Sequence, residues 1–283
     1  MAKIAIITDS TAYLPVEYVK KNQVHVIPLN LHWDSETFKD GMDISADDFY
    51  TRLSHSSSIP TTSQPSAGDF LALYQKLGKD HDGIITALIS AGISGTMDSA
   101  LLAKKEYVGV PVEVLDTRVT AGSLALVVEA LVACVGAGKS LQECVQIAGK
   151  VVESMGTFFV VDTLKYLHRG GRIGGASRFF GTALEIKPIL YFDAEGKIDA
   201  LEKVRTKKKA YLRLKELVAE KADGKKCHMA IMHAQAMQDA ETIKAELSAE
   251  LDLASIGIFD LSPVIGTHVG EGTLGIAVHT VMY

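Results

Sequence analysis

Cysteine, aromatic residues and net positive charge are scarce in this chain of 283 residues. The three cysteines, Cys134, Cys144 and Cys227, are odd in number and form no Cys-x-x-Cys pair, which argues against a disulfide framework or a zinc knuckle. Aromatic residues make up only 7% of the chain. The formal net charge is −5, which argues against a nucleic-acid-binding protein, because such domains are usually strongly basic.

Long apolar runs are also lacking. The stretch that comes closest to a membrane helix, 121–138, carries Glu129 near its centre, and a membrane span needs about 20 apolar residues and rarely contains a charge. This stretch therefore predicts a buried helix. The apolar run at 3–7 is too short for a secretory signal, so we expect a soluble, cytoplasmic protein.

Sequence motifs that form a self-sufficient catalytic unit are absent as well. The chain contains no His-Glu-x-x-His, no EF-hand loop and no Gly-x-Ser-x-Gly, and its histidines do not cluster with cysteines or carboxylates at metal-ligand spacing. The glycine-rich segment 170–175 has neither the Gly-Lys-Ser/Thr ending nor the Gly-x-Gly-x-x-Gly spacing of a phosphate loop. We expect no metal and no cofactor.

What the chain has in excess is aliphatic side chains. Hydrophobic residues make up 47% of it, and few of them are aromatic. This composition rules out a disordered or collagen-like chain, and the length suits one large or two modest domains. The surplus predicts either a large ordinary core or a core that also lines an apolar space.

The order of the apolar runs predicts an α/β fold. Buried strands at 3–8, 24–31, 83–90 and 111–116 alternate with amphipathic helical stretches, which is typical of a parallel sheet with helices on both faces. After about residue 155 the pattern changes to a hairpin at 186–204, followed by helices and three further strands. We therefore predict an N-terminal doubly wound, mainly parallel domain (1–155) and a C-terminal two-layer α/β domain with a mixed sheet (156–283).

Small and hydroxyl-bearing residues follow the predicted strand at 83–90. Ser94, Gly95 and Thr96 precede a helix, whose free N–H groups and dipole favour an anion such as a carboxylate or phosphate. Capping of the helix by Ser94 or Thr96 explains the same residues equally well. Hydroxyl residues also cluster at 61–66, which includes Thr62 and Ser63, and at 8–11, where capping is the simpler explanation.

Two further segments carry charge beside glycine. Arg169 and Arg172 flank flexible backbone and could neutralise an anion, or they could be surface arginines of a loop. His268 lies in the segment 267–272 ahead of the last strand, where a lone histidine is more often structural than functional. Residues 203–226 contain ten Lys or Arg and three Asp or Glu, which favours a solvated helix face over a docking face for an acidic partner.

Taken together, these segments resemble the DegV family of bacterial fatty-acid-binding proteins over nearly the whole chain. The resemblance lies in the order and spacing of Thr8-Asp9-Ser10, Thr62-Ser63-Gln64-Pro65, Ser94-Gly95-Thr96, Leu115-Asp116-Thr117, 164–174, Ile186-Lys187-Pro188 and 266–270. It implies one long-chain fatty acid between two α/β domains, with its carboxylate held by Thr62, Ser94 and His268.

The resemblance also implies partners. Family members are similar to the lipid-carrying subunit of a bacterial fatty-acid kinase, which presents the acid to a separate ATP-dependent kinase that makes acyl phosphate. Arg169 and Arg172 match the basic loop implicated in that partnership, and lipid exchange implies a transient membrane contact. Ser63, Gly95 and Thr96 are candidates for further head-group contacts.

The chain departs from the family pattern at three positions. Ala91 stands where a second serine is common, Met97 where an aromatic residue is common, and Glu271 where proline is frequent. The first two bear on the fit of the acyl chain, and the third places a negative charge near a carboxylate site.

A fatty acid needs donors for its head and a dry aliphatic lining for its tail, since each buried CH₂ contributes about 0.8 kcal/mol. We expect the lining to come from both domains and to include Ile186, Ile189, Leu190 and Ile265. Two alternatives stay open: an autonomous phosphotransferase or small-molecule kinase on a related two-domain fold, and a regulatory protein that binds another apolar acid.

Overall fold

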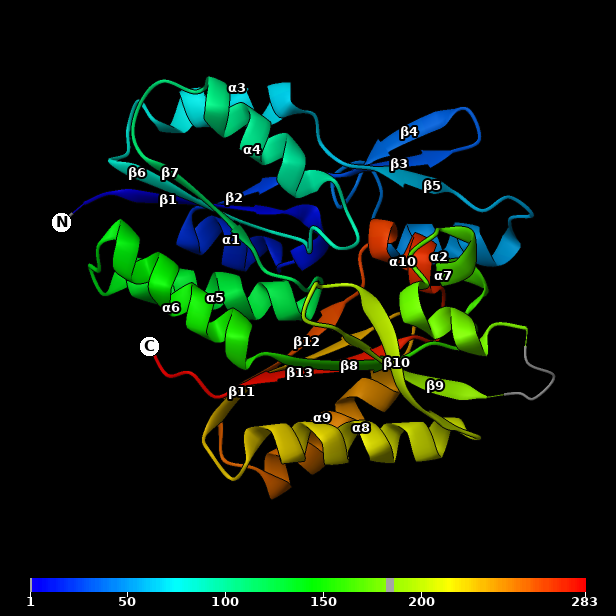
Figure 1. Cartoon of the computed structure of the whole chain (residues 1–283). Coiled ribbons are helices and arrows are strands. Elements are labelled where there is room, and N and C mark those ends of the chain that lie inside the picture. Colours follow the sequence, from blue (N-terminus) through cyan, green and yellow to red (C-terminus); the bar gives the residue numbers. More distant parts are fainter. Residues whose placement is uncertain (1, 182–185) are drawn as a thin grey trace.

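The computed structural model describes residues 2–181 and 186–283. The N-terminal half is built on a parallel sheet in the order β2-β1-β6-β7 (Figure 1). Its strands are β1 Ile4–Asp9, β2 Val24–Ile27, β6 Gly83–Leu88 and β7 Val112–Asp116. Every residue of β1 and β6 is buried, as expected for central strands covered on both faces.

Alternate residues of the central strands face opposite helix layers. Ile84 and Leu88 pack with α3 and α4, whereas Ile85 and Ala87 pack with α5 and α6, because successive side chains on a strand point to opposite faces. The doubly wound parallel sheet is thus confirmed. The helices of this half are α1 Val16–Asn22, α2 Ala46–His55, α3 Ala67–Leu77, α4 Thr96–Glu106, α5 Gly122–Gly136 and α6 Leu141–Ser154.

The single strand expected at 24–31 is in fact two strands. Pro28 lies between β2 and β3 (Asn30–Trp33), and proline lacks the N–H group that a central strand uses. After it the chain leaves the parallel sheet, and β3 forms a separate antiparallel sheet with β4 (Glu36–Lys39) and β5 (Thr61–Ser63). The sequence pattern did not predict this small sheet.

The C-terminal half is built on a mixed sheet in the order β10-β9-β8-β13-β11-β12. Only the pair β11–β12 is parallel, and the predicted hairpin is the antiparallel pair β9–β10. The strands are β8 Gly156–Val160, β9 Lys187–Phe192, β10 Ile198–Val204, β11 Cys227–His233, β12 Leu253–Asp260 and β13 Leu274–His279. The predicted mixed sheet is confirmed.

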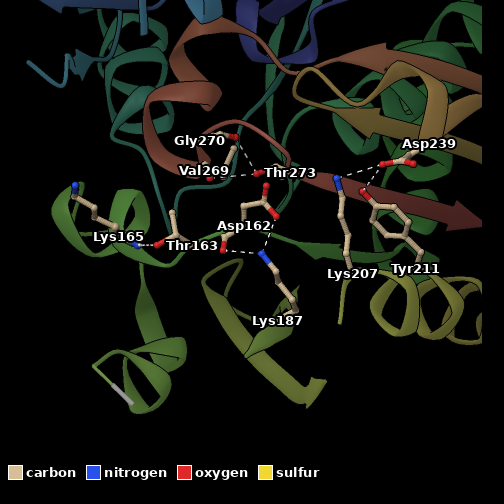
Figure 2. A network of polar contacts seen from close by, with 10 residues as sticks. All are labelled: Asp162, Thr163, Lys165, Lys187, Lys207, Tyr211, Asp239, Val269, Gly270 and Thr273. Atoms are coloured by element: carbon tan, nitrogen blue, oxygen red, sulfur yellow. Dashed lines mark hydrogen bonds and ion pairs between the residues drawn. The ribbon is translucent and has the colours of Figure 1, made fainter. Parts of the chain in front are cut away.

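Helices α8 (Lys207–Ala222) and α9 (Met237–Glu250) cover one face of this sheet. Ion pairs balance part of the basic character of α8. Lys207 lies 3.2 Å from Asp239 (Figure 2), and Lys215 lies 2.6 Å from Glu246. The shorter helices are η1 Ser10–Ala12, α7 Lys165–Arg169, η2 Gly174–Phe179 and α10 Pro263–Val269.

The two halves share one hydrophobic core. Trp33 and Phe49 of the N-terminal half belong to the same buried cluster as Phe159, Met232 and Phe259 of the second sheet. Helix α5 lies between the two sheets and packs against β11 (Figure 1). The parallel sheet precedes residue 155 in the chain, and the mixed sheet follows it. That 1–155 and 156–283 form two separate domains stays a prediction.

The apolar helix α5 is 15 residues long and buried along most of its length. Across the part of the chain that the structure describes, no helix combines the length and apolarity needed to cross a membrane.

Candidate functional site

A mostly apolar cavity lies between the two halves. The space between protein atoms is about 810 Å³, a volume that includes its opening to solvent. Its apolar lining comes from the mixed sheet, from α7 and α10, and from loops of both halves. These residues are Leu29, Ile89, Ile93, Ala121, Phe159, Leu167, Phe192, Ile198, Met232, Leu261, Val264, Ile265 and Val269.

Thr62 and His268 meet in the wall of this cavity. Thr62 lies on β5, opposite Leu31 of β3, and His268 lies on α10, which packs against β5. The hydroxyl of Thr62 is 2.8 Å from Nε2 of His268, although 206 residues separate them. Ser262 caps the helix that carries His268, and Pro263 occupies the first turn of this helix.

Ser94 faces the same cavity from the turn between β6 and α4. Its Oγ lies 2.9 Å from Oγ1 of Thr96 and accepts a hydrogen bond from the Thr96 N–H at 3.3 Å. Thr96 is fully buried and supports Ser94 without lining the cavity. A Cβ on Gly95 would lie 2.6 Å from Nε2 of Gln64, so the Ser94 turn packs directly against the segment that carries Thr62.

Arg172 brings a positive charge to this end of the cavity. Its Nε donates to the carbonyl of Ile93 at 3.1 Å and its guanidinium donates to the carbonyl of Gly170 at 2.6 Å, which joins the glycine-rich loop to the Ser94 turn. Burial, and then the charge of Arg172, lowers the pKa of His268 to about 4. His268 is therefore neutral at pH 7.

The structure brings some of the predicted residues together and separates others. Ser63 reaches the cavity wall, but its Oγ is engaged by His32 at 2.9 Å and by Asn30 at 3.2 Å. Arg169 is exposed on α7. The turn at 8–11 does not reach the cavity, because Asp9 caps η1 and accepts the Ile89 N–H at 2.7 Å.

Of the four predicted lining residues, Ile265 lines the cavity. Ile189 packs among α8 and α9, on the sheet face away from the cavity, and this part of the prediction is corrected because neighbouring strand residues point to opposite faces. Leu190 belongs to the shared core, and Ile186 is half-buried beside the start of β9, but neither contributes to the lining. Phe159, Phe192 and Met232 were not predicted, since no sequence signal separates a lining residue from a core residue.

A second hollow lies outside the polar end of the cavity. Its volume is about 720 Å³, including its opening to solvent. Both spaces are lined by Ile93, Ser94, Arg172 and Ile198. Gly95 and Lys197 line this outer hollow only. The side chains of Ser94 and Arg172 therefore stand between the apolar interior and the surface.

No metal centre accompanies the cavity: residues 2–181 and 186–283 contain no group of three or more His, Cys, Asp or Glu arranged to hold an ion. The fold and the cavity define an α/β protein with an internal cavity, which combines an aliphatic interior with hydroxyl, imidazole and guanidinium groups at one end.

Comparison with known proteins places the chain within this class. It belongs to the DegV family, described as "Uncharacterised protein, DegV family", which matches residues 3–281. It is 37% identical to Protein DegV of Bacillus subtilis over 277 residues, covering 96% of this chain and 98% of that protein. A DegV domain-containing protein of Halalkalibacterium halodurans is 38% identical over 279 residues, or 98% of each chain.

Solved structures of relatives have the same fold. The Bacillus subtilis structure, described as DegV, a fatty acid binding protein, superposes with a TM-score of 0.92 at 35% identity and covers 99% of this chain and 100% of that one. A DegV family protein from Thermus thermophilus, described by its fatty acid binding, has a TM-score of 0.93 at 30% identity with the same coverage.

Proposed function

We propose that this chain binds one long-chain fatty acid in the cavity, with the carboxylate at Thr62, Ser94 and His268 and the tail along the apolar walls. The observation that carries the proposal is an apolar cavity that ends in the Thr62–His268 pair. The fatty acid binding described for relatives from Bacillus subtilis and Thermus thermophilus supports it.

The energetics of such a ligand suit this arrangement. Burial of each CH₂ contributes about 0.8 kcal/mol, so a long tail supplies most of the affinity. A carboxylate buried without hydrogen-bond donors would lose its hydration, and no interaction with the protein would compensate for that loss. Hydroxyl donors and a neutral imidazole can hydrogen-bond to it, and Arg172 contributes positive charge from beside the site.

Once bound, the fatty acid presents its carboxylate through the outer hollow to a separate ATP-dependent kinase. A carboxylate oxygen attacks the γ-phosphorus of ATP, the bond from that phosphorus to the ADP oxygen breaks, and acyl phosphate and ADP form. Because the donors are neutral, the carboxylate keeps its negative charge and remains nucleophilic. The positive charge of Arg172 offsets the negative charge that the phosphate groups bring to the outer hollow.

In this scheme the chain is the substrate carrier, and the kinase supplies the catalytic residues. Arg169, exposed on α7, belongs to the face that the kinase contacts. The carrier works in the cytoplasm and touches the membrane transiently to exchange its lipid.

The binding step is tested by mass spectrometry. Protein purified from cells grown with fatty acids is denatured, extracted with organic solvent and analysed for acyl lipids. We expect about one fatty acid per chain. Absence of acyl lipid, together with no uptake when the purified protein is incubated with fatty acids, would overturn the proposal.

The presentation step is tested with ATP labelled at its γ-phosphate. Fatty-acid-loaded protein is incubated alone and with fractionated host lysate, and hydroxylamine traps any acyl phosphate as a hydroxamate. We expect hydroxamate only when a second protein is present. Its formation by the isolated chain would favour an autonomous phosphotransferase instead.

A further inference from the structure

Helix α10, which carries His268, is held by a carboxylate that lies outside the cavity. Asp40 follows β4 and is only 1% exposed. Its Oδ1 accepts the backbone N–H of Val264 at 3.1 Å, and its Oδ2 accepts the hydroxyl of Ser10 at 2.7 Å. The Ser10 oxygen in turn accepts the N–H of Leu29 at 3.0 Å, so Asp40 is fixed from the N-terminal half.

Val264 and His268 are four residues apart on α10, so they lie on the same side of the helix, and both line the cavity. A rise of about 1.5 Å per residue places His268 roughly 6 Å along the axis from Val264. One turn of helix backbone therefore connects the Asp40 contact at Val264 to the imidazole of His268.

The far end of α10 is held by uncharged groups. The Thr273 hydroxyl donates to the carbonyl of Val269 at 3.1 Å and to that of Gly270 at 3.0 Å, as Figure 2 shows. At the near end, the Ser262 oxygen accepts the N–H of Ile265 at 3.3 Å. Asp40 differs from Thr273 and Ser262 because its side chain can gain or lose a charge.

We propose that Asp40 is a positioning residue for the carboxylate site: its ionised side chain holds the first turn of α10 and thereby sets the orientation of His268 toward Thr62. An anionic acceptor is stronger than a neutral one, and it also interacts favourably with the helix dipole. The role in ligand binding rests on the proposed function, whereas the coupling between Asp40 and His268 is a property of the free protein.

The titration of Asp40 makes this coupling measurable. Burial raises its pKa to about 7, hydrogen bonds from Ser10, Val264 and Ser262 oppose that rise, and the charge of Asp9 adds to it. The other titratable groups in the neighbourhood are Tyr13 and Tyr50, whose pKa values the charge of Asp40 raises, and the carboxylates that act on one or both of these tyrosines, which are Asp47, Asp260 and Glu271. Both tyrosines stay neutral near pH 7, because burial raises their pKa values.

The experiment follows the imidazole ¹⁵N resonances of His268 by NMR from pH 5.5 to 8.5 in ligand-free protein. We expect an inflection near pH 7 in the wild type and none in Asp40→Asn. Asp260→Asn is the matched control, because it removes a half-exposed carboxylate from the same neighbourhood and should keep the inflection. Ser10→Ala removes a hydrogen bond that lowers the pKa of Asp40, and should move the inflection to higher pH.

Ligand binding is measured in parallel with cis-parinaric acid, a fluorescent long-chain fatty acid. We expect Asp40→Asn to weaken its affinity about fivefold at pH 8, the size of a charge interaction at a helix end, and by less at pH 6, where wild-type Asp40 is itself mostly protonated. A uniform loss at both pH values would indicate a merely structural role.

Identical His268 titrations in the wild type and Asp40→Asn would overturn the inference. If Asp40→Asn does not fold, an unchanged inflection in Ser10→Ala overturns it instead. If the wild type binds no fatty acid while the NMR coupling is present, the proposed function fails and the link from Asp40 to His268 stands.

Discussion

The side chains at the polar end of the cavity are a threonine, a serine and a neutral histidine, none of which is reactive alone. Their effect comes from convergence: Thr62 lies 2.8 Å from His268, and Ser94 faces the same space from another loop. Because burial and Arg172 lower the pKa of His268, this end of the cavity provides hydrogen bonds together with one nearby positive charge.

Replacement of Ser94 by alanine tests its part in holding a carboxylate. Loss of one donor to a charged group should weaken fatty-acid affinity by about 1–3 kcal/mol, with little change in the free energy of unfolding. The measurement is displacement of cis-parinaric acid by palmitate. Ser248→Ala, an exposed position on α9, is the control and should bind normally. Unchanged affinity in Ser94→Ala would remove Ser94 from the head-group site.

The sequence indicated some of the residues at this end of the cavity more clearly than others. Hydroxyl residues after strand ends drew attention to Ser94 and Thr62, but capping explained them equally well from sequence alone. The assignment of Thr62, Ser94 and His268 to one site came from family resemblance, and it stays part of the proposal. Ile189 was misplaced because one residue along a strand changes the face that a side chain occupies.

At the scale of elements, the hairpin β9–β10 closes one side of the cavity. Phe192 and Ile198 of the hairpin contribute to the lining. Its tip is fixed to the N-terminal half, since the Ser90 hydroxyl donates to the carbonyl of Gly196 at 2.7 Å. Gly92 packs so closely that a Cβ there would lie 2.6 Å from the carbonyl oxygen of Glu195.

The substitution Gly92→Ala should therefore push the hairpin tip away. We expect a loss of about 1–3 kcal/mol in the free energy of unfolding, as for overpacked sites, and faster hydrogen exchange at the amides of 193–197. Gly149→Ala is the matched control, since no atom lies within 4 Å of a Cβ at that position of α6, and it should stabilise by about 0.5–1 kcal/mol. Equal effects of the two substitutions would contradict this account of the hairpin.

Elements with strong local patterns were predicted well, including the parallel strands and the hairpin. The antiparallel sheet β4-β3-β5 and helix α10 were not. Their strands and turns are short, and α10 has only seven residues, so long-range packing outweighs any periodicity that such segments can show.

At the scale of the whole molecule, the cavity lies between two halves of the chain that share a core. Phe159, Met232 and Phe259 of the second sheet pack in one cluster with Trp33 and with residues of α5. A C-terminal half separated from residues 1–155 would expose that face of its sheet, because α8 and α9 cover the other face.

We therefore expect the chain to unfold in one cooperative transition. Trp33 is the only tryptophan and is fully buried in the N-terminal half, so its fluorescence reports on that half, whereas far-ultraviolet circular dichroism reports on the whole chain. In urea the two curves should coincide. Separate midpoints would instead show that 1–155 and 156–283 unfold as independent domains.

The sequence by itself determined the α/β class, the parallel and mixed sheets and the change of pattern near residue 155, because buried strands and amphipathic helices are encoded by local periodicity. It also showed the scarcity of aromatic residues and the surplus of aliphatic ones, which left open whether the surplus filled a core or lined a space. Only the tertiary structure decided that part of it lines a cavity. It also decided that His268 reaches Thr62 and that Asp40 holds α10, because these contacts join residues more than 200 positions apart, beyond the reach of any local pattern.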